Sequence, residues 1–120
     1  MTLAQKAAMI LDNKKAVDIV PLNVAHLTVL TDEMLIASGR SSVQVRAMCD
    51  ELEEKLSVEG IEPIRTEGYT DGRWIILDYG NLIVHLFHKE DREYYGLDRL
   101  WTDGNNVLPV PESEEEAENQ

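Results

Sequence analysis

The chain has 120 residues, with 23 acidic against 11 basic side chains and a formal net charge of −12. This is the length of a single domain, which buries a core without help from a metal or a disulfide. The acidic balance argues against binding to a nucleic-acid backbone, because that backbone requires a basic surface. The opening residues carry no signal-peptide pattern, and no apolar run reaches the roughly 20 residues that span a bilayer, so we expect a cytoplasmic protein without membrane contact.

The first third of the sequence predicts a helix, an edge strand and a buried strand. Residues 3–11 carry apolar side chains at helical spacing. Residues 16–22 have the composition of a strand, and Pro21 assigns that strand to a sheet edge or a bulge, because proline has no N–H to donate. The apolar side chains of residues 23–32 fit neither period, so we expect a strand end followed by a loop or a short helical turn there, and the apolar run at 34–37 predicts a buried strand.

The clearest helix follows a serine-rich turn. Ser41 and Gln44 have the spacing of a capping box, in which each side chain bonds the backbone amide of the other residue. The apolar residues that follow form one stripe at helical spacing, which predicts a helix packed on a sheet, and Gly60 suits the position after its C-cap. The stripe consists of Val45, Met48, Cys49, Leu52 and Leu56. Cys49 has no second cysteine to pair with, so we interpret it as a buried thiol.

The fold class follows from the alternation of these elements. Residues 63–69 predict a strand after the helix, and a strand–helix–strand unit predicts a parallel, right-handed pair. A hairpin then adds antiparallel strands at 74–78 and 82–87, joined by the turn residues Tyr79-Gly80-Asn81. We therefore predict an α/β fold, a single domain with a mixed sheet of about five strands flanked by helices.

The two strands of the hairpin present two different faces, because side chains alternate along a strand. The purely apolar face is the natural core face and consists of Ile75, Leu77, Tyr79, Leu82, Val84 and Leu86. The mixed face consists of Trp74, Ile76, Asp78, Ile83, His85 and Phe87. Its composition suits contact with a partly polar partner. The alternative is that a C-terminal helix of the same chain covers this face, and the two interpretations can both hold in part.

The last predicted element is a short helix at 89–95 that Gly96 interrupts. The apolar residues after it offer an edge beside the hairpin; they are Leu97, Leu100 and Trp101. Proline and glutamate then dominate, which is typical of a disordered segment. We therefore divide the chain into a folded domain, residues 1–104, and an acidic, disordered tail, residues 105–120.

Sequence patterns for enzymatic or metal chemistry are weak, and we predict no catalytic, metal-binding or cofactor-binding residue. His85 and His88 lie three apart on a predicted strand and point to opposite faces, so they cannot chelate one ion together. The turn from Ser38 to Ser42 precedes a helix N-terminus, which suits an anion, but it lacks the lysine and glycine spacing of a P-loop. A nucleotide-handling enzyme that uses this turn is the alternative function.

Several blocks of the sequence recur together in one protein family. They are Ile36–Ser42, Glu67–Tyr69, Gly72–Gly80, Val84–Phe87, Arg92–Tyr95, Leu97 and Arg99–Trp101. The most specific part is Trp-Ile-Ile-Leu-Asp-Tyr-Gly followed by Val-His-Leu-Phe. With these blocks, residues 3–103 strongly resemble the ribosomal silencing factor RsfS, also called the Iojap or YbeB family. The chain departs from that family at Glu33-Met34, where an aromatic pair is usual.

The resemblance implies a fold, a partner and a mechanism. The fold would be similar in topology to nucleotidyltransferases but without their catalytic carboxylates. Members of the family bind a large-subunit ribosomal protein, the fourteenth in the usual naming, and block joining of the small subunit when nutrients are scarce. A role in large-subunit maturation is also associated with them. The chain would then be a translation repressor and not an enzyme, and its exposed sheet face could also pair two copies as a homodimer.

The mixed face and the apolar edge after it supply the residues that we expect to form or support a ribosome-facing surface. Aromatic side chains would serve as buried anchors, and Asp78 would make a charge-assisted bond to a basic side chain of the partner. An acidic chain with such a face suits a basic ribosomal protein. The predicted partner-binding residues are Trp74, Ile76, Asp78, His85, Phe87, Tyr95, Leu97, Leu100 and Trp101.

Overall fold

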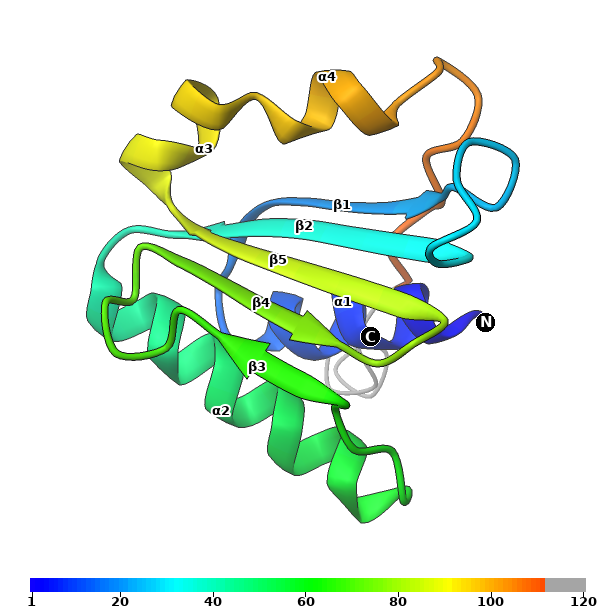
Figure 1. Cartoon of the computed structure of the whole chain (residues 1–120). Coiled ribbons are helices and arrows are strands. Elements are labelled where there is room, and N and C mark those ends of the chain that lie inside the picture. The colour runs from blue at the N-terminus through cyan, green and yellow to red at the C-terminus, as the bar shows by residue number, and fades with distance from the viewer. Residues whose placement is uncertain (112–120) are drawn as a thin grey trace, which may run out of the picture.

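The computed structural model describes residues 1–111, which form one five-stranded sheet with helices on both faces (Figure 1). The helices are α1 (Leu3–Asn13), α2 (Ser42–Val58), α3 (Lys89–Tyr95) and α4 (Leu97–Trp101). The strands are β1 (Val17–Asn23), β2 (Glu33–Gly39), β3 (Arg65–Glu67), β4 (Trp74–Asp78) and β5 (Leu82–His88). Figure 1 shows α1 and α2 on one face of the sheet and the shorter α3 and α4 on the other. The predicted α/β domain with a mixed sheet is confirmed.

The sheet has the strand order β1-β2-β5-β4-β3. β2 and β5 are parallel, and the other neighbouring strands are antiparallel. The strands before and after α2 run in the same direction, as predicted, but β2 and β3 are not hydrogen-bonded neighbours, because β5 and β4 lie between them. The physical reason is burial: all three residues of β3 are exposed, which suits a sheet edge, whereas β4 and β5 bury apolar side chains and take the centre.

The serine turn caps α2 as predicted, but only one half of the capping box forms. The Ser41 hydroxyl accepts a hydrogen bond from the backbone N–H of Gln44 at 3.1 Å. The side chain of Gln44 accepts instead from the N–H of Arg40 at 2.6 Å and donates to the carbonyl oxygen of Lys15 at 3.1 Å. Gln44 therefore ties the start of α2 to the segment that precedes β1.

The larger core lies between the sheet and the pair α1 and α2. The six apolar hairpin residues predicted for the core face are all buried in it, and the predicted stripe of α2, Cys49 included, packs against them. A smaller cluster lies on the opposite face beneath α3 and α4; it consists of Leu22, Val24, Met34, Ile36 and Phe87. The mixed face therefore has a core of its own, in line with the alternative that a C-terminal helix of the same chain covers this face.

The folded domain continues past the boundary that the sequence predicts at residue 104. Asn106 is buried, Val107 forms a β-bridge with Leu22, and the N–H of Leu108 donates to the carbonyl oxygen of Pro21 at 2.8 Å. β1 is thus the edge strand that Pro21 predicts, and the chain after α4 returns to cover part of it. The remainder of the predicted tail, residues 112–120, lies outside the described residues.

Candidate docking surface

The strand register builds the mixed face as short rows of side chains across the sheet. Trp74 on β4 lies opposite Phe87 on β5, and Ile76 lies opposite His85. A third row joins Asp78 to Ile83. The sequence alternation predicted this grouping, and the observed pairing confirms it, because residues of the mixed face lie opposite one another in all three rows. A shift of one residue in register would instead have turned one strand's set to the other face.

The helices α3 and α4 cover one end of these rows. The Trp74 ring stacks on Phe87 with centroids 4.9 Å apart, and Tyr95 of α3 lies 4.7 Å from Trp74. Leu97 and Trp101 of α4 pack against the smaller cluster. Phe87 is fully buried beneath these groups, so it supports the face and does not form its outer surface. The alternative interpretation, cover by the same chain, therefore holds for this end.

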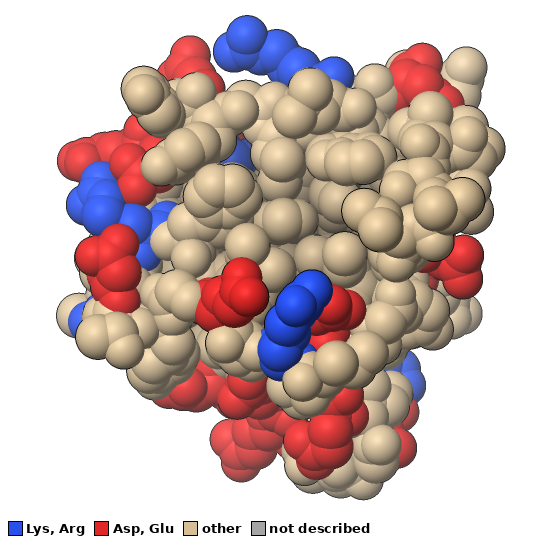
Figure 2. All heavy atoms as spheres, viewed as in Figure 1, with Lys and Arg blue, Asp and Glu red and all other residues tan. Residues whose placement is uncertain are grey.

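The remaining part of the mixed face stays open between the two short helices and the β3 edge. Trp74, Ile76 and Ile83 are each partly exposed, and Tyr95 is exposed. Figure 2 shows a broad region without charged side chains across the centre of this view, with acidic groups gathered along its lower margin. We call this region the docking surface; it consists of Trp74, Ile76, Ile83, His85, Tyr95 and Leu100.

Leu100 belongs to the docking surface because of its position on α4. Its side chain is 70% exposed. Asp98 lines a pocket together with Asp18 and Val20 of β1, so that side of α4 points toward β1. Two residues further along a helix point about 200° away, which turns Leu100 toward the open part of the sheet.

His85 is the buried polar member of the docking surface. It is only 8% exposed, and the indole N–H of Trp74 donates to its Nδ1 at 3.1 Å. Burial lowers the pKa of His85 to about 4, because a charged imidazolium loses its hydration there. The ring is therefore neutral at pH 7 and cannot act as a cation toward a partner.

Asp78 is occupied within the chain. One carboxylate oxygen accepts from the backbone N–H of Gly80 at 2.8 Å and so holds the hairpin turn. The other lies 3.5 Å from Nε of Arg65 on β3. The predicted bond from Asp78 to a basic side chain of a partner would have to replace or share this contact with Arg65.

Two arginines attach α3 and α4 to the sheet. Arg73 donates to both carboxylate oxygens of Asp91, at 2.8 and 3.0 Å. Arg92 makes the same forked contact to Asp98 and also donates to the hydroxyl of buried Ser38 at 2.8 Å. These hydrogen bonds hold the pKa values of Asp91 and Asp98 below their usual range. Sequence reasoning missed this support, although Arg92 belongs to the family-like blocks.

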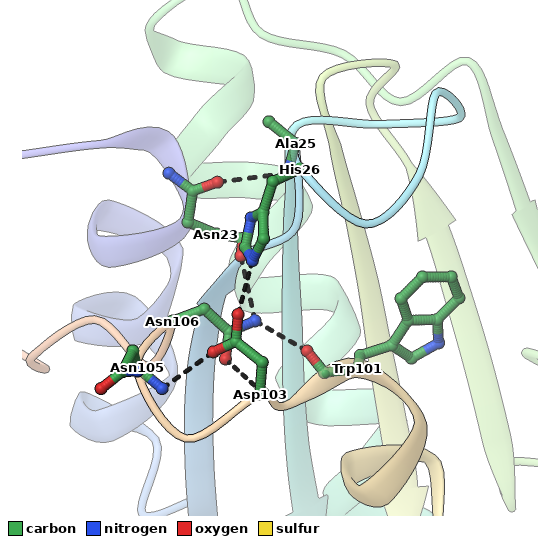
Figure 3. Close-up of polar contacts among 7 residues, drawn as sticks. All are labelled: Asn23, Ala25, His26, Trp101, Asp103, Asn105 and Asn106. Carbon is green, nitrogen blue, oxygen red and sulfur yellow. Dashed lines mark hydrogen bonds and ion pairs between the residues drawn. The ribbon is translucent and has the colours of Figure 1, made fainter.

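The loop between β1 and β2 is fastened to the segment after α4 by a polar network (Figure 3). Asn106 donates from its side-chain amide to the carbonyl oxygens of Asn23 and Trp101, at 3.0 and 2.7 Å. His26 Nε2 lies 2.6 Å from a carboxylate oxygen of Asp103. This contact contributes to holding the pKa of Asp103 below its usual range.

The tip of the same loop carries exposed apolar side chains that the sequence prediction left out. They are Leu27, Val29 and Leu30, and Val29 is fully exposed. The sequence did indicate that these side chains could be exposed. Apolar residues that fit neither a helical nor a strand period are not assigned to the buried face of any predicted element. Figure 1 shows this loop beside the segment that follows α4.

Within residues 1–111, no group of three or more His, Cys, Asp or Glu side chains is arranged to hold a metal ion. The same part of the chain has no helix long and apolar enough to cross a membrane. The hydroxyl of Ser38, in the turn considered for nucleotides, is buried and accepts from Arg92. The candidate site is therefore the docking surface.

Comparisons with known proteins agree on one family. Residues 1–120 match the family model described as "RsfS: Ribosomal silencing factor during starvation". A Halalkalibacterium halodurans relative named ribosomal silencing factor RsfS is 42% identical over 105 residues, which cover 88% of this chain and 90% of that protein. A mouse relative named mitochondrial assembly of ribosomal large subunit protein 1 is 30% identical over 96 residues, 78% of this chain and 42% of that protein. A solved structure from Chromobacterium violaceum superposes with a TM-score of 0.79 at 30% identity, covering 92% of this chain and 96% of that one.

Proposed function

This chain belongs to the ribosomal silencing factor family, and we propose that it binds the large ribosomal subunit through its docking surface and thereby blocks association with the small subunit. The partner would be one basic protein of the large subunit, the fourteenth in the usual naming. Binding would repress translation when nutrients are limiting. The proposal assigns the protein to the cytoplasm, together with the ribosomes.

The open, apolar docking surface is the observation that carries this proposal. Partly exposed Trp74 and exposed Tyr95 and Leu100 lie on one side of a chain whose net charge is −12. Contiguous apolar surface rimmed by polar groups marks protein–protein contact sites, and aromatic residues commonly dominate the energy of such contacts. The acidic surroundings favour a basic partner over another acidic protein.

Steric exclusion is the mechanism that this geometry supports. The fold has a core of ordinary apolar residues; in the turn before α2 the Ser38 hydroxyl is buried and accepts from Arg92, and the Ser41 hydroxyl caps the helix by accepting from the N–H of Gln44. A domain of this kind regulates by occupying a surface, not by changing a substrate. Large-subunit maturation is the second candidate function, and the name of the mouse relative favours it.

Co-sedimentation with purified ribosomal subunits tests the proposal. The protein is expected to pellet with free large subunits, not with small ones, and to lower the amount of joined ribosomes when both are mixed. Pelleting with neither subunit would refute the proposed function.

A variant pair assigns that binding to the docking surface. Leu100→Asp is expected to weaken binding to large subunits at least about tenfold, because it buries a carboxylate in an apolar contact. Val58→Asp is the matched control, since Val58 is also highly exposed but lies on α2, on the opposite face of the sheet. Equal loss of binding in both variants would count against the docking surface.

The free protein could also pair two copies through the docking surface. Light scattering over a concentration series measures this directly. A mass equal to one chain at every concentration excludes a homodimer, whereas a dimer that Leu100→Asp abolishes would mean that self-association and ribosome binding compete for one surface.

Calorimetry with nucleotide and magnesium tests the enzyme alternative. We expect only heats of dilution, because the Ser38 hydroxyl is buried and already accepts a hydrogen bond from Arg92. Saturable binding would revive the nucleotide-handling function.

A further inference from the structure

His85 is a polar side chain buried among apolar neighbours. In the sheet it lies between Ile36 of β2 and Ile76 of β4, and it is 8% exposed. The ring is neutral at pH 7, because burial lowers its pKa to about 4. A neutral imidazole has one nitrogen that donates and one that accepts, and the two tautomers present different chemistry to a partner.

Trp74 determines which nitrogen of His85 carries the proton. The indole N–H can only donate, and it lies 3.1 Å from Nδ1 of His85. Nδ1 must therefore accept, so the single ring proton is on Nε2. The indole is itself held in place by Phe87 and Tyr95, whose ring centroids lie 4.9 and 4.7 Å from it.

Nε2 of His85 has no hydrogen-bond partner among residues 1–111. Among residues 1–111, the hydroxyl oxygen of Tyr79 is the one fully buried side-chain nitrogen or oxygen that lacks a hydrogen-bond partner. Nε2 of His85 also lacks a partner but does not belong to that class, so it is not fully buried and keeps contact with solvent. His85 is thus more than nine-tenths buried, with its free donor opening onto the docking surface. A donor that loses water when a partner docks must find an acceptor, because an unpaired buried group is costly.

We propose that His85 offers its Nε2–H to an uncharged carbonyl oxygen of the protein that binds the docking surface, with Trp74 as the positioning residue that holds this tautomer. The inference rests on the proposed function and names the chemistry that the partner must present at one point of the contact. A backbone carbonyl from a loop or a strand edge supplies it.

The surroundings of His85 favour a carbonyl over a carboxylate. Ile36 and Ile76 flank the ring in the sheet, and a carboxylate would lose its hydration beside them. Glu67 of β3, the cross-strand neighbour of Ile76, already contributes negative charge at the margin of the same face. A second carboxylate would be repelled there, whereas an uncharged oxygen would not.

Nitrogen NMR on the unmodified protein tests the tautomer first. With ¹⁵N-labelled histidine at pH 7, His85 is expected to show a pyrrole-type Nε2 resonance and a pyridine-type Nδ1 resonance. A pyrrole-type Nδ1 resonance would mean that Nδ1 carries the proton, which would overturn the inference. Trp74→Phe removes the indole donor and is expected to give a mixture of both tautomers, which a merely space-filling role of Trp74 would not produce.

Binding to purified large ribosomal subunits tests the donor. His85→Phe fills the same space without an N–H and is expected to raise the Kd about tenfold, because the partner's carbonyl loses its donor. His85→Gln can accept from Trp74 and donate outward, so it is expected to stay within about threefold of the parent. Urea unfolding of each variant verifies that the domain is folded.

The outcomes separate this inference from the proposed function. A parent protein that does not bind large subunits defeats both. A parent that binds, together with an equal Kd for His85→Phe, defeats only the role of His85. If His85→Phe does not fold, the NMR result on the parent and the affinity of His85→Gln decide, and a tenfold loss with glutamine would contradict the proposed donor.

Discussion

At the scale of single residues, the buried imidazole of His85 links folding to pH. Its pKa is lowered from 6.5 to about 4 in the folded state. Below pH 6.5 the unfolded chain takes up a proton that the folded chain does not, so the free energy of unfolding falls as the pH falls from about 6.5 to about 4. One pKa unit corresponds to about 1.4 kcal/mol. The titration of this histidine therefore lowers the free energy of unfolding by roughly 3 kcal/mol over that pH range.

Urea unfolding at pH 7.5 and pH 4 measures this contribution. Between these two pH values the free energy of unfolding is expected to fall by about 3 kcal/mol more in the parent than in His85→Gln, because glutamine does not titrate. The carboxyls Asp91 and Asp98 add acid sensitivity in both proteins at lower pH, since their pKa values are lowered from 3.8. Equal losses in parent and variant would mean that His85 titrates normally in the folded protein.

Cys49 has neither the exposure nor the low pKa of a reactive thiol. It is fully buried, and burial raises its pKa to about 12, with Glu53 and Asp50 adding to the effect. The thiolate is the reactive form, so alkylation by iodoacetamide at pH 8 is expected to be slow in native protein and complete in urea. Mass spectrometry after timed quenching gives both rates. Rapid native labelling would contradict the burial of this thiol.

At the scale of elements, α3 and α4 are too short to be stable by themselves and depend on their attachment to the sheet. Arg92 is the central contact, because one guanidinium group reaches both Asp98 of α4 and Ser38 of β2. Its side chain is only 11% exposed. Loss of a mostly buried partner leaves a carboxylate and a hydroxyl without their donor.

The substitution Arg92→Met is therefore expected to lower the free energy of unfolding by about 2 kcal/mol. Hydrogen exchange in α3 and α4 is expected to rise more than exchange in α1 and α2. Arg99→Met is the matched control: Arg99 lies on α4 and is exposed, so its loss is expected to change stability by less than about 0.5 kcal/mol. Similar destabilisation by both variants would exclude the specific role of Arg92.

The loop before β2 offers a second test at this scale. Asp103→Asn weakens the contact to His26, and faster amide exchange is expected at residues 24–28. The global free energy of unfolding should hardly change, because both side chains are substantially exposed. Unaltered exchange in this loop would show that the hydrogen bonds from the Asn106 side chain to backbone carbonyl oxygens suffice to hold it.

At the scale of the whole molecule, the chain after α4 closes the fold. Asn106 bonds two backbone carbonyls, Val107 bridges Leu22, and Leu108 packs against the larger core. A chain that ends at residue 104 is expected to lose about 2 kcal/mol of stability or more, since a buried amide network and an apolar contact disappear together. A chain that ends at Pro111 is the control, because it keeps the contacts of Asn106, Val107 and Leu108 and is therefore expected to retain this stability in urea unfolding. No loss on truncation at 104 would support the domain boundary predicted from the sequence.

The sequence by itself determined the features that depend on local geometry. Alternation along Trp74–Asp78 and Leu82–His88 separated the core face from the mixed face, because every strand turns successive side chains to opposite sides. The stripe from Val45 to Leu56 predicted the buried side of α2 for the same reason, with a period of 3.6 residues. The most specific part of the family resemblance, Trp-Ile-Ile-Leu-Asp-Tyr-Gly followed by Val-His-Leu-Phe, lies in the two strands β4 and β5 and the turn between them.

The tertiary structure alone decided what depends on contacts between distant residues. Periodicity does not say which strands are neighbours, so the separation of β2 from β3 was not predictable from it. Nor does it say what covers a face: Phe87 is buried because α3 and α4 fold back over it, while Ile76, one row away, stays partly open. The contacts of Asp78 with Arg65 and of Asn106 with Asn23 likewise exist only once the sheet is assembled. Local pattern sets which way a side chain points, and only the packed chain sets what it meets there.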